Sequence, residues 1–111
     1  MGGFIKGEVV TLPFPFSDLS QNKFRPALVI TDLKGDDLIL CQITHKAEKG
    51  DSYKVALTNS DFSKGHLNVD SFIRPNRLFT ADSKIIKNTN GKVSNGKLTE
   101  VIDKLIEIIK T

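Results

Sequence analysis

The chain has 111 residues, of which 39% are hydrophobic and 26% charged, and this composition is typical of one ordinary globular domain with its own core. We therefore predict a single domain over residues 1–111. No apolar run is long enough to span a membrane, and "MGGFIKGEVV" is too short and polar for a secretory signal, so we expect a cytoplasmic protein without a membrane partner. The net charge of +3 is compatible with a polyanionic partner but does not require one.

The first half of the chain predicts three strands. "GEVVTLPFPF" (7–16) alternates with a period of two, but Pro13 and Pro15 cannot donate ladder hydrogen bonds, so we expect an edge strand or a strand exit. "PALVITD" (26–32) is almost continuously apolar, which predicts a strand buried on both faces. After the tight turn "LKGDD", the segment "DLILCQITHK" (37–46) is its hairpin partner.

The middle of the chain carries shorter signals. "YKVALT" alternates, which predicts a strand with Tyr53 turned inward. "DFSKGHLNVD" (61–70) has the composition of a loop, and "SFIRPNRLFTAD" (71–82) predicts short strand pieces broken by Pro75. "IIKNTNGKV" (85–93) contains Asn-Gly, a turn signal.

The last predicted element is an amphipathic helix. Ser94 is suited to its N-cap, and Val93 and Leu98 have the spacing of a hydrophobic staple. Its apolar residues recur at helical spacing: Leu98, Val101, Ile102, Leu105, Ile108 and Ile109. Several short strands and one packing helix predict a mainly β fold, a small and strongly bent antiparallel barrel with a C-terminal helix.

Arg25 stands where a polar segment becomes a buried strand, and the following Pro26 restricts it to extended geometry. Its planar guanidinium suits phosphate oxygens, although a solvated arginine, or one paired with Asp18 or Glu8, is the alternative on the residues alone. Thr44 ends one face of the third strand. If the second and third strands pair, Arg25 and Thr44 lie at the same end of the hairpin, which predicts a phosphate site.

Other kinds of site find little support in the sequence. His45 and His66 lack a further ligand at useful spacing, and Cys41 fits a core position, so we predict no metal and no cofactor. Ser17 and Ser20 lack the strand–turn–helix context of a nucleophile and are interpreted as turn residues that could touch a ligand.

Additional positive and aromatic side chains could serve a nucleic acid. Lys23, Arg74 and Arg77 add positive charge, although each taken singly is best explained as a solvated surface charge. Phe16 and Phe24 could stack a base, although core aromatics are commoner at strand ends.

The stretch "GEVVTLPFPFSDLSQNKFRPALVI", with "ILCQITHK" and more weakly "RPNRLFTADSKI", resembles the MazF/PemK family of toxin endoribonucleases. The combination of FPF with K-x-RP is the most specific part. The resemblance implies an SH3-like barrel, a fold shared with gyrase-poisoning toxins, that forms a homodimer. It also implies cleavage of single-stranded mRNA at short sequences without a metal, and neutralisation by a cognate antitoxin whose acidic segment folds into the same basic groove.

The implied reaction is transesterification, in which the 2′-hydroxyl of the RNA attacks the adjacent phosphorus and leaves a 2′,3′-cyclic phosphate and a 5′-hydroxyl. By the resemblance, Arg25 holds the scissile phosphate and stabilises its developing charge, and Thr44 donates its hydroxyl to the same phosphate. Loop 17–24 would shape the groove. The expected RNA-binding residues are Phe16, Ser17, Asp18, Ser20, Lys23, Phe24, Arg74 and Arg77.

The sequence departs from the family at the position of an acidic residue that some members use for proton transfer. Arg74 stands there, so Asp70 and His45 are the candidates for proton transfer, although His45 taken singly is better explained as a surface residue. Two alternative functions are compatible with the same fold and involve no enzymatic activity. A gyrase-binding toxin is disfavoured by the charged ending "EIIKT" and leaves Arg25 and Thr44 without a role. A peptide-binding SH3-like module is disfavoured by the presence of one Tyr and no Trp.

Overall fold

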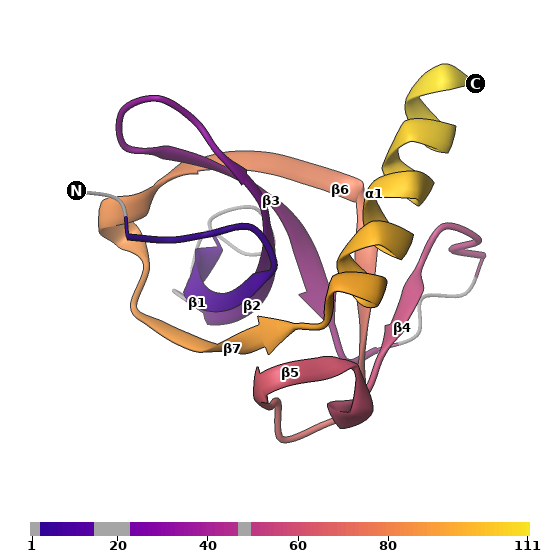
Figure 1. Cartoon of the computed structure of the whole chain (residues 1–111), viewed down its shortest axis with the longest axis horizontal. Helices are drawn as coiled ribbons and strands as arrows, with labels where there is room; N and C mark the ends of the chain where they lie inside the picture. Colours follow the sequence, from indigo (N-terminus) through magenta and orange to yellow (C-terminus); the bar gives the residue numbers. More distant parts are fainter. Residues whose placement is uncertain (1–2, 15–22, 47–49) are drawn as a thin grey trace.

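The computed structural model describes residues 3–14, 23–46 and 50–111, whose strands form one curled antiparallel sheet with a C-terminal helix (Figure 1). The strands are β1 (Glu8–Phe14), β2 (Lys23–Asp32), β3 (Asp37–Thr44), β4 (Val55–Leu57), β5 (Phe62–Gly65), β6 (Ser71–Asp82) and β7 (Asn88–Val93). Two short 3₁₀ helices, η1 (Asn59–Asp61) and η2 (Ser83–Ile85), precede the helix α1 (Asn95–Lys110).

The strand order β4-β6-β3-β2-β1-β7-β5 explains why the sheet curls into a barrel. Its two edge strands, β4 and β5, are consecutive in the chain and are separated only by residues 58–61. The two ends of the sheet must therefore lie close together, as Figure 1 shows. The predicted mainly β fold, a small SH3-like antiparallel barrel with a C-terminal helix, is confirmed.

β1 lies inside the sheet and contributes to two hydrophobic clusters. Val9 packs in the cluster that also contains residues of α1, whereas Val10 and Leu12 belong to a second cluster on the other face. β1 pairs with β2 from Val9 to Phe14 but with β7 only from Glu8 to Thr11, so at Pro13 the strand is paired with β2 alone. Of the two predictions for this proline-containing segment, the strand exit is correct and the edge strand is wrong.

β6 is one long strand, not the short pieces that its proline predicted. Cys41 of β3 lies opposite Leu78. The next residue of β3, Gln42, lies opposite Arg74, so residues 75–77 bulge out of the ladder. A bulge tolerates proline because the bulged position does not need to donate a ladder hydrogen bond.

The segment predicted as a loop begins with the last residue of η1 and contains β5, and Asn90-Gly91 lies within β7 rather than in a turn. Glycine is required here for close approach of two backbones. A Cβ added to Gly91 would collide with the carbonyl oxygen of Lys64, and one added to Gly65 would collide with that of Asn90. The Asn-Gly signal therefore reflects crowding between β5 and β7.

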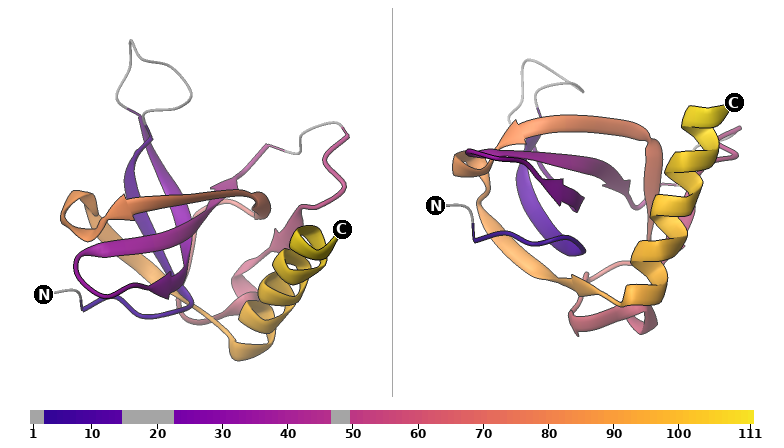
Figure 2. Two further views of the ribbon diagram at one scale, coloured as in Figure 1. Left: turned by 90° about the horizontal axis from the view of Figure 1, so that it is seen from above. Right: turned by 45° about the horizontal axis from the view of Figure 1, so that its top comes forward.

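α1 begins as predicted, because the Ser94 hydroxyl accepts a hydrogen bond from the Lys97 N–H at 3.2 Å. Val101 and Leu105 are buried against the sheet. Ile109, which was expected in the same apolar face, is 72% exposed. Its exposure follows from the path of α1, whose last turns extend past the sheet (Figure 2). No helix among the described residues is long and apolar enough to cross a membrane.

β4 is shorter than the alternation of its sequence suggests. Val55 and Leu57 are buried, but Tyr53 precedes the strand and is 43% exposed. The expected inward position of Tyr53 is therefore wrong. Its backbone N–H donates a hydrogen bond to Asp51 Oδ1 at 3.0 Å, which holds this part of the chain in a turn instead of a strand.

Candidate functional site

β2 and β3 bring Arg25 and Thr44 to the same end of their hairpin. The ladder pairs Ala27 with Gln42, and the same register continued by two residues sets Arg25 level with Thr44. Both side chains are half-buried and line one open pocket of about 150 Å³. The juxtaposition expected from the sequence is thus present, and the role of both residues at a phosphate stays a prediction.

The Thr44 hydroxyl is oriented by the chain that follows it. Its Oγ1 accepts a hydrogen bond from the Lys46 N–H at 3.2 Å. This bond uses a lone pair of the oxygen, so the hydroxyl hydrogen remains available for donation to an oxygen atom in the pocket.

The opposite wall of the pocket comes from the segment before β6 and from the first residue of β6. It consists of Leu67, Asn68, Val69 and Ser71. The Ser71 hydroxyl donates a hydrogen bond to the carbonyl oxygen of Val69 at 2.8 Å, which shapes this wall. The pocket therefore combines a guanidinium and a hydroxyl on one side with a largely apolar surface on the other, an arrangement suited to an anionic group attached to an organic body.

The two candidates for proton transfer differ in position. His45 is exposed and lines the pocket directly after Thr44. Asp70 is also exposed and lies between two residues of the opposite wall, Val69 and Ser71, but is not itself among the lining residues.

Several predicted RNA-binding residues lie near this end of the sheet. Lys23 and Phe24 begin β2 and are exposed, and Arg77 is exposed in the β6 bulge. The Lys87 ammonium lies 4.5 Å from the centroid of the Phe24 ring. Sequence reasoning missed Lys87 because only the tertiary structure brings it beside the start of β2. Phe16, Ser17, Asp18 and Ser20 lie outside the described residues.

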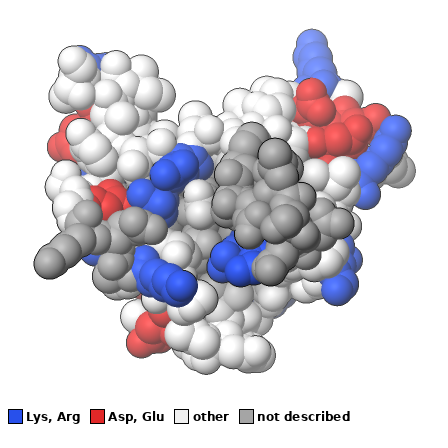
Figure 3. All heavy atoms as spheres, turned by 180° about the vertical axis from the view of Figure 1, so that it is seen from behind, with Lys and Arg blue, Asp and Glu red and all other residues white. Residues whose placement is uncertain are grey.

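The surface charge is unevenly distributed. On the face opposite to the view of Figure 1, Lys and Arg side chains gather near the middle, and most acidic side chains lie toward the rim (Figure 3). Such a distribution favours a polyanionic ligand on this face.

Arg74 is not the solvated charge that the sequence suggested. It is buried, and its Nε donates a hydrogen bond to Asp51 Oδ2 at 2.9 Å. The side chain of Asp51 is only 4% exposed. Arg74 therefore pairs within the protein, which disfavours its predicted contact with RNA. The sequence contained no local signal for this pair, because 23 residues separate its members.

The environment of Asp51 favours its charged form. Burial alone would raise the pKa of this carboxyl, but the hydrogen bonds from the Tyr53 N–H and Arg74, together with the positive charges of Arg74 and Lys54, outweigh it. The pKa of Asp51 consequently lies below its ordinary value of 3.8.

Burial raises the pKa of the Cys41 thiol to about 12, so this cysteine is an inert core residue as its sequence context predicted.

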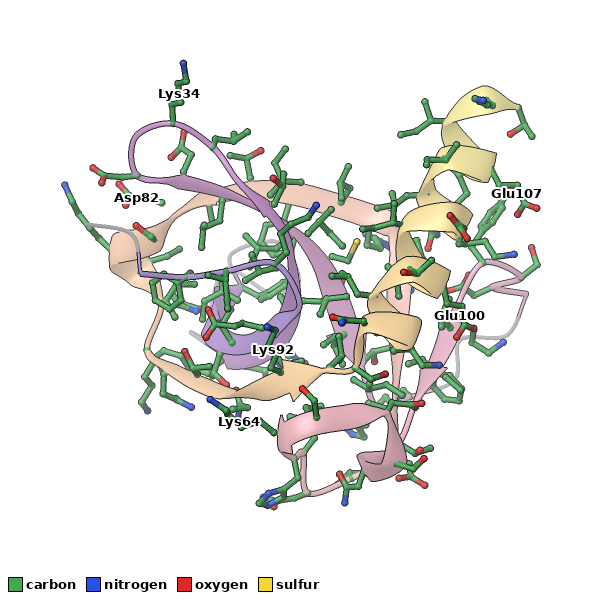
Figure 4. The ribbon with its side chains drawn as sticks, viewed as in Figure 1. Lys34, Lys64, Asp82, Lys92, Glu100 and Glu107 are labelled. Carbon is green, nitrogen blue, oxygen red and sulfur yellow. The ribbon has the colours of Figure 1, made fainter. Side chains whose placement is uncertain are left out.

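A wider hollow of about 390 Å³ lies between β1, β5 and β7. Lys64 and Lys92 lie directly opposite each other across β5 and β7, and Figure 4 shows both at this side of the molecule. Glu8 of β1 lies opposite Lys92 on its other side, so its carboxylate offsets part of their repulsion. Within the described ranges, no group of three or more His, Cys, Asp or Glu side chains is placed to hold a metal ion.

Solved structures share this fold at low sequence identity. An endoribonuclease in complex with its cognate antitoxin from a mycobacterial species has a TM-score of 0.76 at 12% identity, covering 97% of this chain and 96% of that chain. MazF from Deinococcus radiodurans has a TM-score of 0.74 at 24% identity, covering 97% of each chain. The Mycobacterium tuberculosis toxin MazF-mt6 has a TM-score of 0.71 at 14% identity, covering 93% of this chain and 96% of that chain. The fold is therefore that of MazF toxins.

The sequence comparison establishes the family. The model of the PemK-like, MazF-like toxin of type II toxin–antitoxin systems matches residues 5–109, nearly the whole chain. The chain therefore belongs to this toxin family, and the resemblance seen in its sequence is confirmed. No curated protein matches the chain at a significant level.

Proposed function

We propose that this protein is a toxin endoribonuclease that cleaves single-stranded mRNA at short specific sequences in the cytoplasm, and that a cognate antitoxin neutralises it. The observation that carries the proposal is the pocket lined by both Arg25 and Thr44 in a chain of the PemK/MazF-like family. The similar structures support it, since they include an endoribonuclease bound to its antitoxin. None of the three similar proteins described above is named as a gyrase-binding toxin.

The proposed reaction needs no nucleophile from the protein, because the 2′-hydroxyl of the RNA attacks the adjacent phosphorus. The protein must hold the phosphate, stabilise the charge that develops on its oxygens and move protons. Arg25 holds the phosphate through its planar fork, and Thr44 donates its hydroxyl hydrogen to a phosphate oxygen. His45 is the better placed of the two candidates for proton transfer, because it lines the pocket and Asp70 does not.

Cleavage of a long single-stranded RNA in excess EDTA tests the proposed reaction. We expect discrete cuts whose products carry 5′-hydroxyl and 2′,3′-cyclic phosphate ends, because no step requires a metal ion. The ends are identified by adaptor ligation with and without prior phosphorylation. Absence of cleavage by a folded preparation free of antitoxin, or cleavage only after a divalent metal is added, would contradict the proposal.

We further propose that the active form is a homodimer, with the exposed apolar side of α1 covered by a second copy. Ile102, Ile106 and Ile109 recur at the spacing of one helical face, and the last two are exposed. Ile109→Lys is expected to shift the mass measured by light scattering from dimer to monomer. Thr111→Lys adds the same charge outside this face and should leave the mass unchanged. A monomeric wild type, or a dimeric Ile109→Lys variant at equal concentration, would contradict this arrangement.

A further inference from the structure

A second hollow, of about 200 Å³, opens beside the β6 bulge. Its lining comes from β1, β3 and β6 and consists of Phe14, Gln42, Arg77, Leu78 and Phe79. The hollow exists because residues 75–77 leave the ladder opposite the step from Cys41 to Gln42. Bulges of this kind re-aim side chains and occur often next to active sites.

The hollow and the Arg25–Thr44 pocket are neighbours on the same side of the sheet. Gln42 precedes Thr44 by two residues on β3, so their side chains point to the same face about 7 Å apart. Phe14 bears the same relation to Leu12, which lies opposite Arg25 in the β1–β2 ladder. A ligand held by a phosphate between Arg25 and Thr44 could therefore place its next group in this hollow.

The lining has the chemistry of a site for a planar heteroaromatic ring. The Phe14 and Phe79 rings meet edge to face with centroids 5.0 Å apart, and Leu78 adds exposed apolar surface. The half-buried Gln42 amide offers a donor and an acceptor side by side, the pattern that pairs with a base edge. Exposed Arg77 adds a positive charge at the rim, where a flanking phosphate of the same strand would lie.

We propose that this hollow is a base-recognition subsite for the nucleotide adjoining the scissile phosphate, with Gln42 reading the edge of the base and Phe14, Leu78 and Phe79 providing its apolar wall. The proposal rests on the proposed RNA cleavage and deepens it by assigning a source of sequence specificity. Single-stranded RNA is recognised in this way, by unstacked bases held against apolar or aromatic side chains and read on their edges.

Gln42→Glu tests the subsite, because it preserves the shape of the side chain and replaces its donor by an acceptor. Wild type and variant are compared on a pool of single-stranded RNAs randomised around a mapped cut. We expect the base preference at one position next to the cut to change by about tenfold, while preferences elsewhere stay the same. Asn59→Asp makes the same amide-to-carboxylate change at an exposed residue of η1 and should leave every preference unchanged.

A binding experiment separates failure of this inference from failure of the proposed function. The probe is a 2′-O-methyl RNA, which cannot undergo transesterification, with each of the four bases in turn at the adjoining position. Loss of discrimination among these probes by Gln42→Glu, without loss of discrimination at other positions, supports the subsite even if wild type cleaves no RNA. Unchanged discrimination by a variant that binds overturns the subsite, whatever the outcome for cleavage.

A second variant guards against a folding defect, because Gln42 is half-buried within β3. Gln42→Leu keeps a side chain of similar size and removes both hydrogen-bonding groups. It is expected to bind the four 2′-O-methyl probes with nearly equal affinity. Thermal unfolding shows which of the two variants is folded, and only a folded variant is used to judge the proposal. If a folded Gln42→Leu still discriminates among the four bases, the proposal is overturned.

Discussion

Replacing Arg25 by alanine will lower the rate of RNA cleavage by on the order of a hundredfold or more, with little change in the free energy of unfolding. Arg25 lines the pocket and belongs to neither hydrophobic cluster, so its removal takes little from the core. Loss of a donor that stabilises charge developing on a phosphate acts mainly on the transition state. Single-turnover cleavage at saturating RNA measures the first effect, and urea denaturation measures the second.

Two further variants make this result specific to the guanidinium at that place. Arg25→Lys keeps the charge but loses the planar fork, and should retain an intermediate rate. Lys34→Ala removes a positive charge from the turn between β2 and β3, at the other end of the hairpin (Figure 4), and should cleave at the wild-type rate. If Arg25→Ala cleaves RNA at the wild-type rate, Arg25 is not part of the active site. If this variant is unfolded, Arg25 is a structural residue.

Breaking the buried ion pair by Asp51→Ala will lower the free energy of unfolding by about 3–5 kcal/mol. The variant leaves the Arg74 guanidinium buried without the carboxylate that it contacts at 2.9 Å. Asp36→Ala is the matched control, because it breaks an exposed ion pair with Lys84 and should cost less than about 1 kcal/mol. Urea denaturation at pH 7 compares the two.

Replacing both partners tests whether the stability lost by Asp51→Ala comes from the uncompensated charge of Arg74. Asp51→Leu combined with Arg74→Met removes both charges and should recover most of the stability lost by Asp51→Ala, because no uncompensated charge remains buried. A double variant that is no more stable than Asp51→Ala would show that the loss comes from packing or from the turn around Asp51 instead.

The same pair gives the protein a pH dependence. Because the pKa of Asp51 is held below its ordinary value of 3.8, its contribution is fully present above that value and is lost as the pH falls through the lower pKa of the folded state. Below pH of about 4, wild type should therefore lose stability more steeply than Asp51→Asn. Parallel curves of unfolding free energy against pH for the two proteins would contradict this assignment.

Local patterns in the sequence were sufficient for several parts of the fold. The almost continuous apolar run of residues 26–32 and the "LKGDD" turn predicted the β2–β3 hairpin, which is why Arg25 and Thr44 could be placed at one end of it. Ser94 identified the start of α1 because an N-cap acts on the backbone only three residues away. Each of these signals depends on residues that are close in the sequence, and the physical cause is equally local.

The remaining features depend on contacts between distant segments, and only the tertiary structure decided them. The β6 bulge arises from its register against β3, and it forms the hollow beside Gln42. The Asn-Gly pair that predicted a turn lies within β7, where glycine is needed for the close approach of β5 and β7. Arg74, which was expected at the surface, is buried because it pairs with Asp51. By itself the sequence determined the family, the hairpin and the candidate phosphate residues, because these follow from local order along the chain. Register and burial decided which other residues remain free to meet a ligand, because they depend on how strands far apart in the chain pair.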